Sequence, residues 1–242
     1  MSANRRSGMT LQGSRLTAAA VAPKPPLTEQ AYQTLRESIL RGTIVAGERL
    51  KIDVLQRDLD VSSSPLREAL NRLVAENLVV ADERRGFRAA PVTRKDLTDL
   101  ATIRAVVEPG ALVESMRAGS DVWESQVVAA FYRLDRIERR VNAGELARDD
   151  EWTARHKEFH LALISGCGSE RLVALYSGLF DQSERYRRLS ASFRQKPRDT
   201  ASEHKKLMEA SLARDPVAAV LLRQHIDLTA KHLTAVLCEL QG

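Results

Sequence analysis

The chain lacks the features of a secreted or membrane-spanning protein. It has only two cysteines in 242 residues, Cys167 and Cys238, which are too few for a disulfide framework. It contains no run of 18 apolar residues, so no segment is expected to cross a bilayer, and its N-terminus has no apolar signal core. We therefore expect a cytoplasmic protein with no membrane partner.

The chain also lacks a charge excess in the part that is expected to fold. The net charge is +5, but residues 1–28 supply four basic residues and no acidic one. Residues 29–93 hold ten basic and ten acidic side chains, and residues 94–242 hold 23 and 22. We expect residues 1–28 to form a disordered basic tail. Specific binding to nucleic acid would therefore depend on where individual arginines lie.

The most informative segment covers residues 61–78, where apolar residues recur at helical spacing. Ser64 is predicted to cap the helix and Pro65 to take its first position, where a missing N–H costs nothing. The inward stripe consists of Leu66, Ala69, Leu70, Leu73 and Val74. The outward groups at the start of the helix are those that contact phosphates and base edges in a major groove: Ser63, Ser64, Arg67 and Asn71.

A small β-wing is predicted directly after this helix. The period changes to two after Leu78, and residues 79–81 can pair with residues 87–91 across a tight turn. Arg84, Arg85 and Gly86 lie at the tip of this turn. Upstream, residues 29–41 and 52–59 are predicted to form two helices, so the order is helix, helix, turn, helix, wing.

The segments AGERL, VSSSPLREALNRLVAENLV and RRGF resemble the winged helix-turn-helix of the GntR family of bacterial transcription regulators. The resemblance implies a domain over residues 29–93 that binds double-stranded DNA through the helix-start and wing residues named above. The alternative is that Arg67 and Arg72 are only solvated surface charges.

Three positions depart from the family pattern. The family usually has an arginine where this chain has Ser63, which leaves Arg67 as the main base-reading donor. The family usually has glycine at Asp60 and Asn77, so both residues are expected to adopt a positive φ, which Asp and Asn accept better than other non-glycine residues.

Residues 94–242 show helical periodicity to the end and no convincing strand. Glycine and proline breaks predict about six helices, over residues 94–118, 121–143, 149–166, 169–193, 198–213 and 216–240. An antiparallel bundle is the economical packing. The expected fold class is therefore mainly α, with an N-terminal winged helix-turn-helix and a C-terminal helical bundle.

All five histidines of the chain lie in the expected bundle, and four of them are predicted to point inward. His156 and His160 share one helix face, His204 precedes two apolar residues, and His225 lies among leucines on the last helix. Buried imidazoles need partners. Hydrogen-bonding groups of the core are one solution, and a divalent metal such as Zn²⁺ or Ni²⁺, which satisfies several imidazoles at once, is the other.

The patterns HKEFH, SEHKKLMEA and LLRQHI resemble the all-helical effector domain (FCD domain) of the FadR-type branch of GntR regulators. In many members an Asp and three His hold a metal, which implies His160, His204 and His225 as ligands here. His156 stands where the Asp usually is, giving an all-nitrogen set. His232, one heptad after His225, is an alternative ligand.

Arg104 lies on the apolar stripe of the first bundle helix and therefore needs an anion. Glu108, one turn later, is one candidate; the carboxylate of a small organic acid, as the resemblance implies, is the other. Tyr186 and Arg187, one heptad after Leu179 and Phe180, are expected to line the same cavity. The segments RHKEFHLALISGCGSERL and QSERYRRLS further resemble regulators of glutarate and 4-aminobutyrate catabolism.

Together these features, and a resemblance that spans residues 29–240, predict a homodimeric regulator. We expect a repressor that a small carboxylate releases from an inverted-repeat operator. One alternative is a metal-dependent hydrolase, although Asp149, Asp150 and Glu158 do not share the histidine face as a catalytic base would. The other is a DNA-binding protein whose metal is purely structural.

Overall fold

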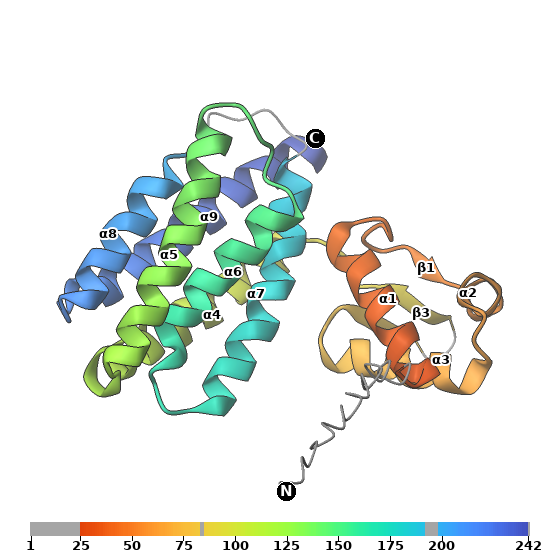
Figure 1. Cartoon of the computed structure of the whole chain (residues 1–242). Helices are drawn as coiled ribbons and strands as arrows, with labels where there is room; N and C mark the ends of the chain where they lie inside the picture. Colours follow the sequence, from red (N-terminus) through yellow and green to blue (C-terminus); the bar gives the residue numbers. More distant parts are fainter. Residues whose placement is uncertain (1–24, 83–84, 192–197, 242) are drawn as a thin grey trace, which may run out of the picture.

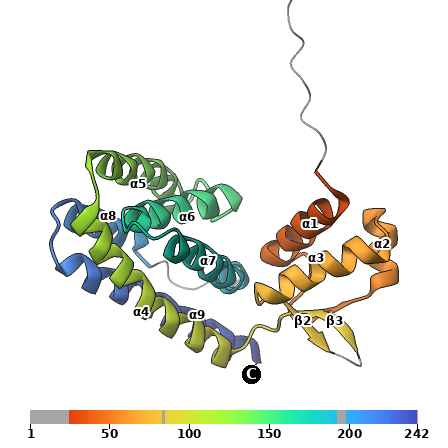
Figure 2. The same cartoon turned by 90° about the horizontal axis from the view of Figure 1, so that it is seen from below.

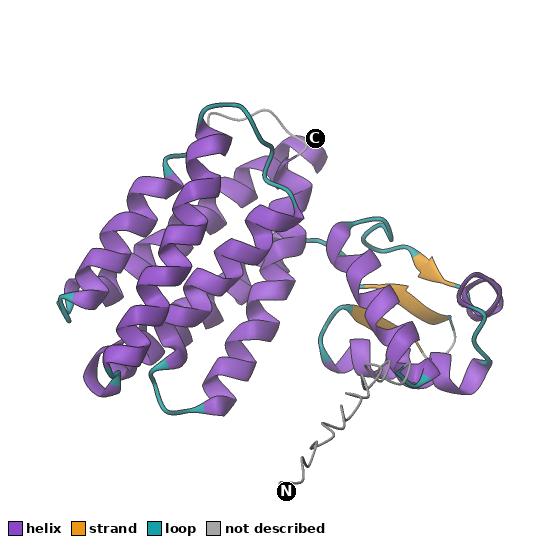
Figure 3. Ribbon diagram, in the orientation of Figure 1, coloured by secondary structure: helices purple, strands orange, loops and turns teal. Residues whose placement is uncertain are grey.

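The computed structural model describes residues 25–82, 85–191 and 198–241. Most of the basic tail expected over residues 1–28, and Arg84 of the wing, lie outside them. In the described part a small N-terminal unit of short helices and strands is followed by a bundle of long helices (Figures 1 and 3). The expected fold class is confirmed.

The N-terminal unit contains α1 (Leu27–Arg41), α2 (Ile52–Leu59), α3 (Ser63–Ala75) and three short strands. The strands β1 (Arg49–Leu50), β2 (Val79–Asp82) and β3 (Gly86–Ala89) form an antiparallel sheet in the order β1-β3-β2. The wing hairpin pairs Val79 with Ala89 and Asp82 with Gly86. The strand β1 was not predicted because two residues are too short to show a periodicity.

The apolar stripe of α3 packs against α1 and the sheet to form the core of this unit. Leu66, Ala69, Leu70 and Leu73 are completely shielded from solvent. Asp60 follows the last residue of α2 with a φ of 51°, and Asn77 lies in the turn after α3 with a φ of 57°. Both positive angles confirm the expectation for two positions where the family usually has glycine.

The predicted start of α3 was wrong by two residues. The helix begins at Ser63 with Ser62 in the capping position, so Ser64 is inside the helix rather than its cap. Pro65 is therefore the third helical residue. Its missing N–H is still harmless, because the first turn of a helix has no backbone acceptors for its N–H groups.

The C-terminal unit is a bundle whose helices match the predicted ones to within a few residues: α4 (Arg94–Ala118), α5 (Asp121–Asn142), α6 (Asp150–Ser165), α7 (Glu170–Ala191), α8 (Thr200–Leu212) and α9 (Val217–Gln241). Figure 2 shows α4 and α9 side by side on one edge of the bundle and α5 on the opposite edge. No described helix is long and apolar enough to cross a membrane.

The two units meet mainly where α1 packs against α7. Arg36 of α1 forms ion pairs with Glu76, at the end of α3, and with Asp181 of α7. Arg185 of α7 donates a hydrogen bond to the carbonyl of Ala90, in the segment that links the wing to α4. The helix α7 is therefore tied to the N-terminal unit through both α1 and the linker.

The positive φ of Asn77 gives a stability prediction. Asn77→Gly should change the free energy of unfolding by only a few tenths of a kcal/mol, whereas Asn77→Val should lower it by about 1–2 kcal/mol, because a β-branched residue is strained in this region. Thermal unfolding of the full chain measures both. Equal stability of the two variants would contradict the backbone assignment.

Candidate nucleic-acid interface and candidate metal centre

The first two turns of α3 present a polar surface to solvent. Ser63, Ser64, Arg67 and Asn71 are all exposed. The Arg67 guanidinium forms no hydrogen bond or ion pair with any described residue. Arg72, by contrast, lies 2.8 Å from Glu29 and packs its guanidinium 3.8 Å from the centre of the Tyr32 ring. Arg67 is free to contact a ligand, and Arg72 is held within the domain.

The wing tip is the second exposed polar surface of this unit. Arg85 and Gly86 are exposed at its end, and Gly86 has a φ of 79°, which a tight turn requires. The backbone N–H of Arg85 donates to the carbonyl of Asp82 across that turn, at 3.1 Å. The turn therefore directs the polar tip of the hairpin away from the core.

The four histidines predicted to point inward converge in the middle of the bundle. His156 and His160 come from α6, His204 from α8 and His225 from α9. One nitrogen from each ring lies within 4.8 Å of the others, and the Nε2 atoms of His160 and His204 are 3.4 Å apart. All four side chains are buried. This arrangement of nitrogen donors could hold one metal ion.

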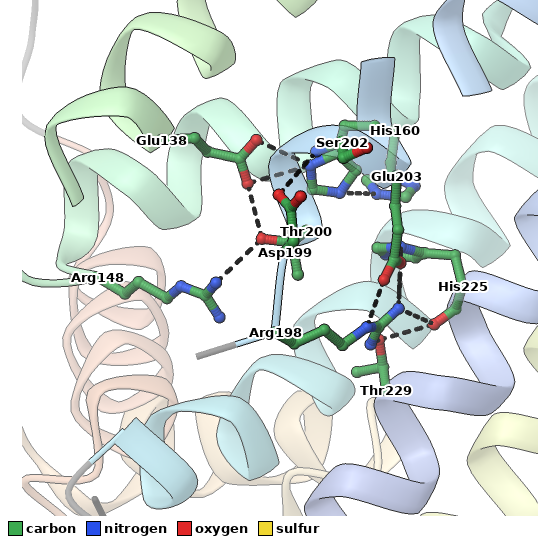
Figure 4. A network of polar contacts seen from close by, with 11 residues as sticks. Glu138, Arg148, His160, Arg198, Asp199, Thr200, Ser202, Glu203, His225 and Thr229 are labelled. Carbon is green, nitrogen blue, oxygen red and sulfur yellow. Dashed lines mark hydrogen bonds and ion pairs between the residues drawn. The ribbon is translucent and has the colours of Figure 1, made fainter. Parts of the chain in front are cut away.

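Two carboxylates fix the orientation of two of these rings (Figure 4). Nδ1 of His204 lies 3.1 Å from both carboxylate oxygens of Glu138, and Nδ1 of His225 lies 2.9 Å from Glu203. An Nδ1–H that donates to a carboxylate leaves Nε2 as a free electron pair. Carboxylates behind ligating histidines are typical of metal centres, where they orient the ring and make it more basic.

Arginine and threonine side chains bind these two carboxylates and each other. Arg198 pairs with Glu203 through two nitrogens and also donates to Oγ1 of Thr229, at 2.8 Å. On the other side, Oγ1 of Thr200 donates to Glu138, at 3.2 Å, and accepts from Arg148, at 3.0 Å. Figure 4 shows both networks converging on the start of α8.

The environment favours the neutral form of three of the imidazoles. Burial lowers the pKa of His156, His160 and His225 well below its usual value, and the neighbouring imidazoles and arginines lower each pKa further. A neutral imidazole has a free electron pair for a metal, and a protonated one does not. Burial therefore favours, in these three histidines, the protonation state that metal binding requires.

One donor has no partner within the described part of the chain. Nδ1 of His156 is buried without a hydrogen bond, while the ring stacks on Trp152 at 4.6 Å. An unpartnered buried polar atom is costly and calls for a ligand.

His232 is only half-buried and lies outside the group of four. Seven residues along a helix span about 10 Å, which is too far for it to replace His225.

Arg104 pairs with Glu108, one of the two anionic partners considered from the sequence. It forms a buried ion pair with Glu108, and its Nη1 donates to Oγ of Ser183 at 3.0 Å. The guanidinium also lies 5.9 Å from the Phe180 ring, which packs against His156. Arg104 is therefore next to the histidines, but its charge is already balanced by Glu108.

Tyr186 and Arg187 do not line the same cavity, so that expectation is corrected. Tyr186 joins the apolar cluster that contains Leu179, and its hydroxyl donates to Asp96 of α4. Arg187 packs on Phe180, 4.4 Å from the ring, on the side of the histidines. Consecutive residues of a helix point about 100° apart, so the two heptad pairs form two separate stripes.

Arg187 and Tyr176, which both lie against Phe180, also carry unpartnered atoms. Within the described residues, Nη2 of Arg187 and the hydroxyl of Tyr176 are buried without a hydrogen bond. Burial raises the pKa of the Tyr176 hydroxyl, which therefore remains a donor. Both groups can donate a hydrogen bond to an anion.

Sequence reasoning missed Glu138, Glu203 and Tyr176. Glu138 is a charged residue at an inward position of α5, next to Ile137, and that misplaced charge was a usable signal. Glu203 directly precedes His204 in the motif that was used. Tyr176 has an ordinary core pattern, and only its missing partner in three dimensions distinguishes it.

Comparison with known proteins assigns the two units. Residues 27–88 match the model of the bacterial regulatory proteins of the gntR family, and residues 99–228, more than half of the chain, match the FCD domain. The chain belongs to the GntR family. It is therefore a DNA-binding transcription regulator with an FCD effector domain rather than an enzyme, which excludes the hydrolase alternative.

Curated relatives and solved structures agree with this assignment. The chain is 37% identical over 232 residues to the uncharacterized regulator BphR of Paraburkholderia xenovorans, covering 94% of this chain and 95% of the relative. It is 36% identical over 200 residues to the repressor GlaR of Escherichia coli, covering 81% and 90%. A GntR regulator from Rhodococcus, described as putative, has the same fold, with a TM-score of 0.67, 23% identity and coverage of 85% and 96%.

Proposed function

We propose that this chain is a metabolite-responsive repressor that acts as a homodimer on an inverted-repeat operator, and that a small carboxylate bound beside a histidine-held divalent metal releases it from the DNA. The observation that carries the proposal is the convergence of four buried histidines next to Phe180, against which Arg187 and Tyr176 pack, each with one unpartnered donor group. The relative GlaR is named a repressor, which supports the direction of regulation.

The donor set suits Zn²⁺ or Ni²⁺. His156, His160, His204 and His225 would hold the ion, and imidazole is a preferred ligand of both metals. The set has no carboxylate of its own, but Glu138 and Glu203 lie directly behind two of the rings and bring two negative charges to the centre. Once bound, the cation would supply a Lewis-acid centre that attracts a carboxylate oxygen.

The effector is proposed to use the donors that the protein leaves unpaired. Nη2 of Arg187 can donate to a carboxylate, the hydroxyl of Tyr176 is a second free donor on α7, and a charge-assisted hydrogen bond from a buried guanidinium is strong. Nε of Arg187 currently donates to Glu184, at 2.9 Å. An anion at Arg187 would compete with Glu184 for that guanidinium and so change the packing of α7.

The helix α7 connects this place to the DNA-binding unit. Phe180 and Arg187 face the histidines, whereas Asp181 and Arg185 contact the N-terminal unit. A change at Arg187 would therefore reach the Arg36–Asp181 ion pair, and through Arg36 the end of the recognition helix α3 at Glu76. This is the route we propose for release.

The DNA surface gives the first functional prediction. Arg67→Ala should remove discrimination between the operator and random DNA, costing about 1–3 kcal/mol per half-site, because Arg67 is the free guanidinium of α3. Arg85→Ala should weaken binding to all sequences and lower the salt dependence. Fluorescence anisotropy with a duplex selected by the protein from a random pool measures both. Equal loss of specific and random binding by Arg67→Ala would overturn its role.

Metal removal gives the second prediction. The chelated full-length protein and His160→Ala should still bind the operator, since the winged domain has its own core, but small carboxylates such as glutarate and succinate should no longer release them. His232→Ala is the matched control and should keep both metal and response.

If the protein holds no stoichiometric Zn²⁺ or Ni²⁺ under any loading condition while an acid still releases DNA, the four-histidine site is wrong. Stoichiometric metal without any response to acids would favour the purely structural metal.

The third prediction tests which of the two arginines, Arg187 or Arg104, contacts the effector. Arg187→Ala should keep the metal but lose the response to acids. Arg104→Ala would leave Glu108 buried and unpaired, which costs about 3–5 kcal/mol, so the informative variant is Arg104→Met with Glu108→Gln. If Arg104 only balances Glu108, this double variant responds as the wild type does; loss of its response would show that Arg104 contacts the effector. A normal response of Arg187→Ala would refute the proposed anchor.

A further inference from the structure

The outer face of α4 carries an exposed apolar stripe that no described residue covers. Ile103, Val106 and Val113 are 47%, 69% and 43% exposed, and Gly110 between them is exposed with open space around the position of a Cβ. Their spacing alternates between three and four residues. This is the pattern of a helix that packs along its length against another helix.

The stripe ends in opposite charges. Asp99, four residues before Ile103, has a side chain that is 59% exposed, and Arg117, four residues after Val113, has one that is 71% exposed. Among the described residues, Asp99 pairs with Lys95 and Arg117 pairs with Glu114, both of them neighbours on α4. Exposed pairs of this kind contribute little and can be exchanged for others.

The stripe is complementary to itself when it is turned end to end. Its residues lie symmetrically about position 108, so an antiparallel copy places Asp99 opposite Arg117, Ile103 opposite Val113 and Val106 opposite Gly110. Each end then joins an acid to a base, and in the middle a larger side chain meets a glycine that allows close approach. A two-fold interface requires such self-complementarity, in which each residue of a pair finds the other on the partner.

The neighbouring helix α9 widens this face. It runs antiparallel to α4, since Arg94 at the start of α4 contacts Cys238 near the end of α9, at 3.5 Å. Val220 and Leu228 of α9 are 52% and 46% exposed. In this antiparallel register Val220 is level with residue 112 and Leu228 with residue 104, so both add exposed apolar surface at the level of the stripe.

We propose that α4 is the surface through which a second copy of this chain binds, in an antiparallel α4–α4 pairing whose two-fold axis passes near residue 108. The inference deepens the proposed function, because it rests on the homodimer that an inverted repeat requires. The pairing also suits the DNA. From residue 108 to the start of α4 is 14 residues, or about 21 Å, so the two DNA-binding units attach about 40 Å apart, close to the roughly 34–36 Å between successive major grooves.

A second apolar surface offers the competing interface. A groove of about 660 Å³ between α5 and α6 is lined by Val122, Leu161 and Val173, and Val122 is 66% exposed. Figure 2 shows α5, which contributes most of this lining, on the edge of the bundle opposite α4 and α9. It lacks the symmetric alternation and the charged ends of the α4 stripe, and we therefore assign the dimer to α4.

A matched pair of valines tests the surface. Val106→Glu should shift the full-length protein from dimer to monomer in sedimentation velocity at micromolar concentration, because it buries two like charges near the axis. Val122→Glu, at almost the same exposure in the competing groove, should leave the dimer intact. A dimeric Val106→Glu with a monomeric Val122→Glu would overturn the proposal in favour of the groove.

A charge exchange tests the register. Asp99→Arg alone and Arg117→Asp alone should each weaken the dimer at least tenfold, since like charges then meet at both ends, and the double variant should recover the wild-type constant. Within one chain, Asp99→Arg places a second positive charge beside Lys95, and Arg117→Asp places a second negative charge beside Glu114. The two intramolecular penalties would therefore add in the double variant, and only pairing across the interface would cancel them. Additive weakening in the double variant would refute this register.

Failure of this inference and of the proposed function can be told apart. A wild-type protein that is a monomer with full operator affinity would refute the homodimer itself. A wild-type dimer that persists in both Val106→Glu and Val122→Glu would refute only the α4 interface.

Discussion

The structure depends on one physical constraint, the burial of four imidazoles that face one another. Burial opposes the charged form of His156, His160 and His225, and Glu138 and Glu203 occupy the outward nitrogens of His204 and His225. The inward nitrogens then have only each other, and electron pairs that face one another in a dry core are unfavourable without a cation. The carboxylates, the arginines that hold them and the packing of α6, α8 and α9 all serve this centre.

The DNA-binding unit and the effector domain share α7 and the linker into α4. Because α7 carries Phe180 and Arg187 toward the histidines and Asp181 and Arg185 toward the N-terminal unit, one helix contacts both functional regions. The helix α4 starts at the end of the linker and exposes a self-complementary stripe. The same bundle would thereby sense a ligand, hold a second copy and set the separation of the two recognition helices.

Much of this architecture could be predicted from the sequence, because periodicity and breakers determine helices directly. The approximate bounds of the bundle helices, the positive φ of Asp60 and Asn77 and the convergence of the four histidines were all expected. The start of α3 was misplaced, since three consecutive serines and a proline leave several capping positions open. Tyr186 was misplaced because heptad spacing relates residues on one stripe and does not say which of two adjacent stripes faces the site. The roles of Glu138, Glu203 and Tyr176 depend on contacts between helices far apart in the sequence, which no local pattern encodes.

The most direct test of the account is X-ray absorption spectroscopy of the full-length protein loaded with Zn²⁺ or Ni²⁺, recorded before and after addition of an acid that releases DNA. The account predicts a first shell with several imidazole nitrogens, at about 2.0–2.1 Å for Zn²⁺, no sulfur, and an added oxygen ligand once the acid is present. A shell that contains sulfur, or one with fewer than three imidazoles, would contradict the four-histidine centre on which the account rests.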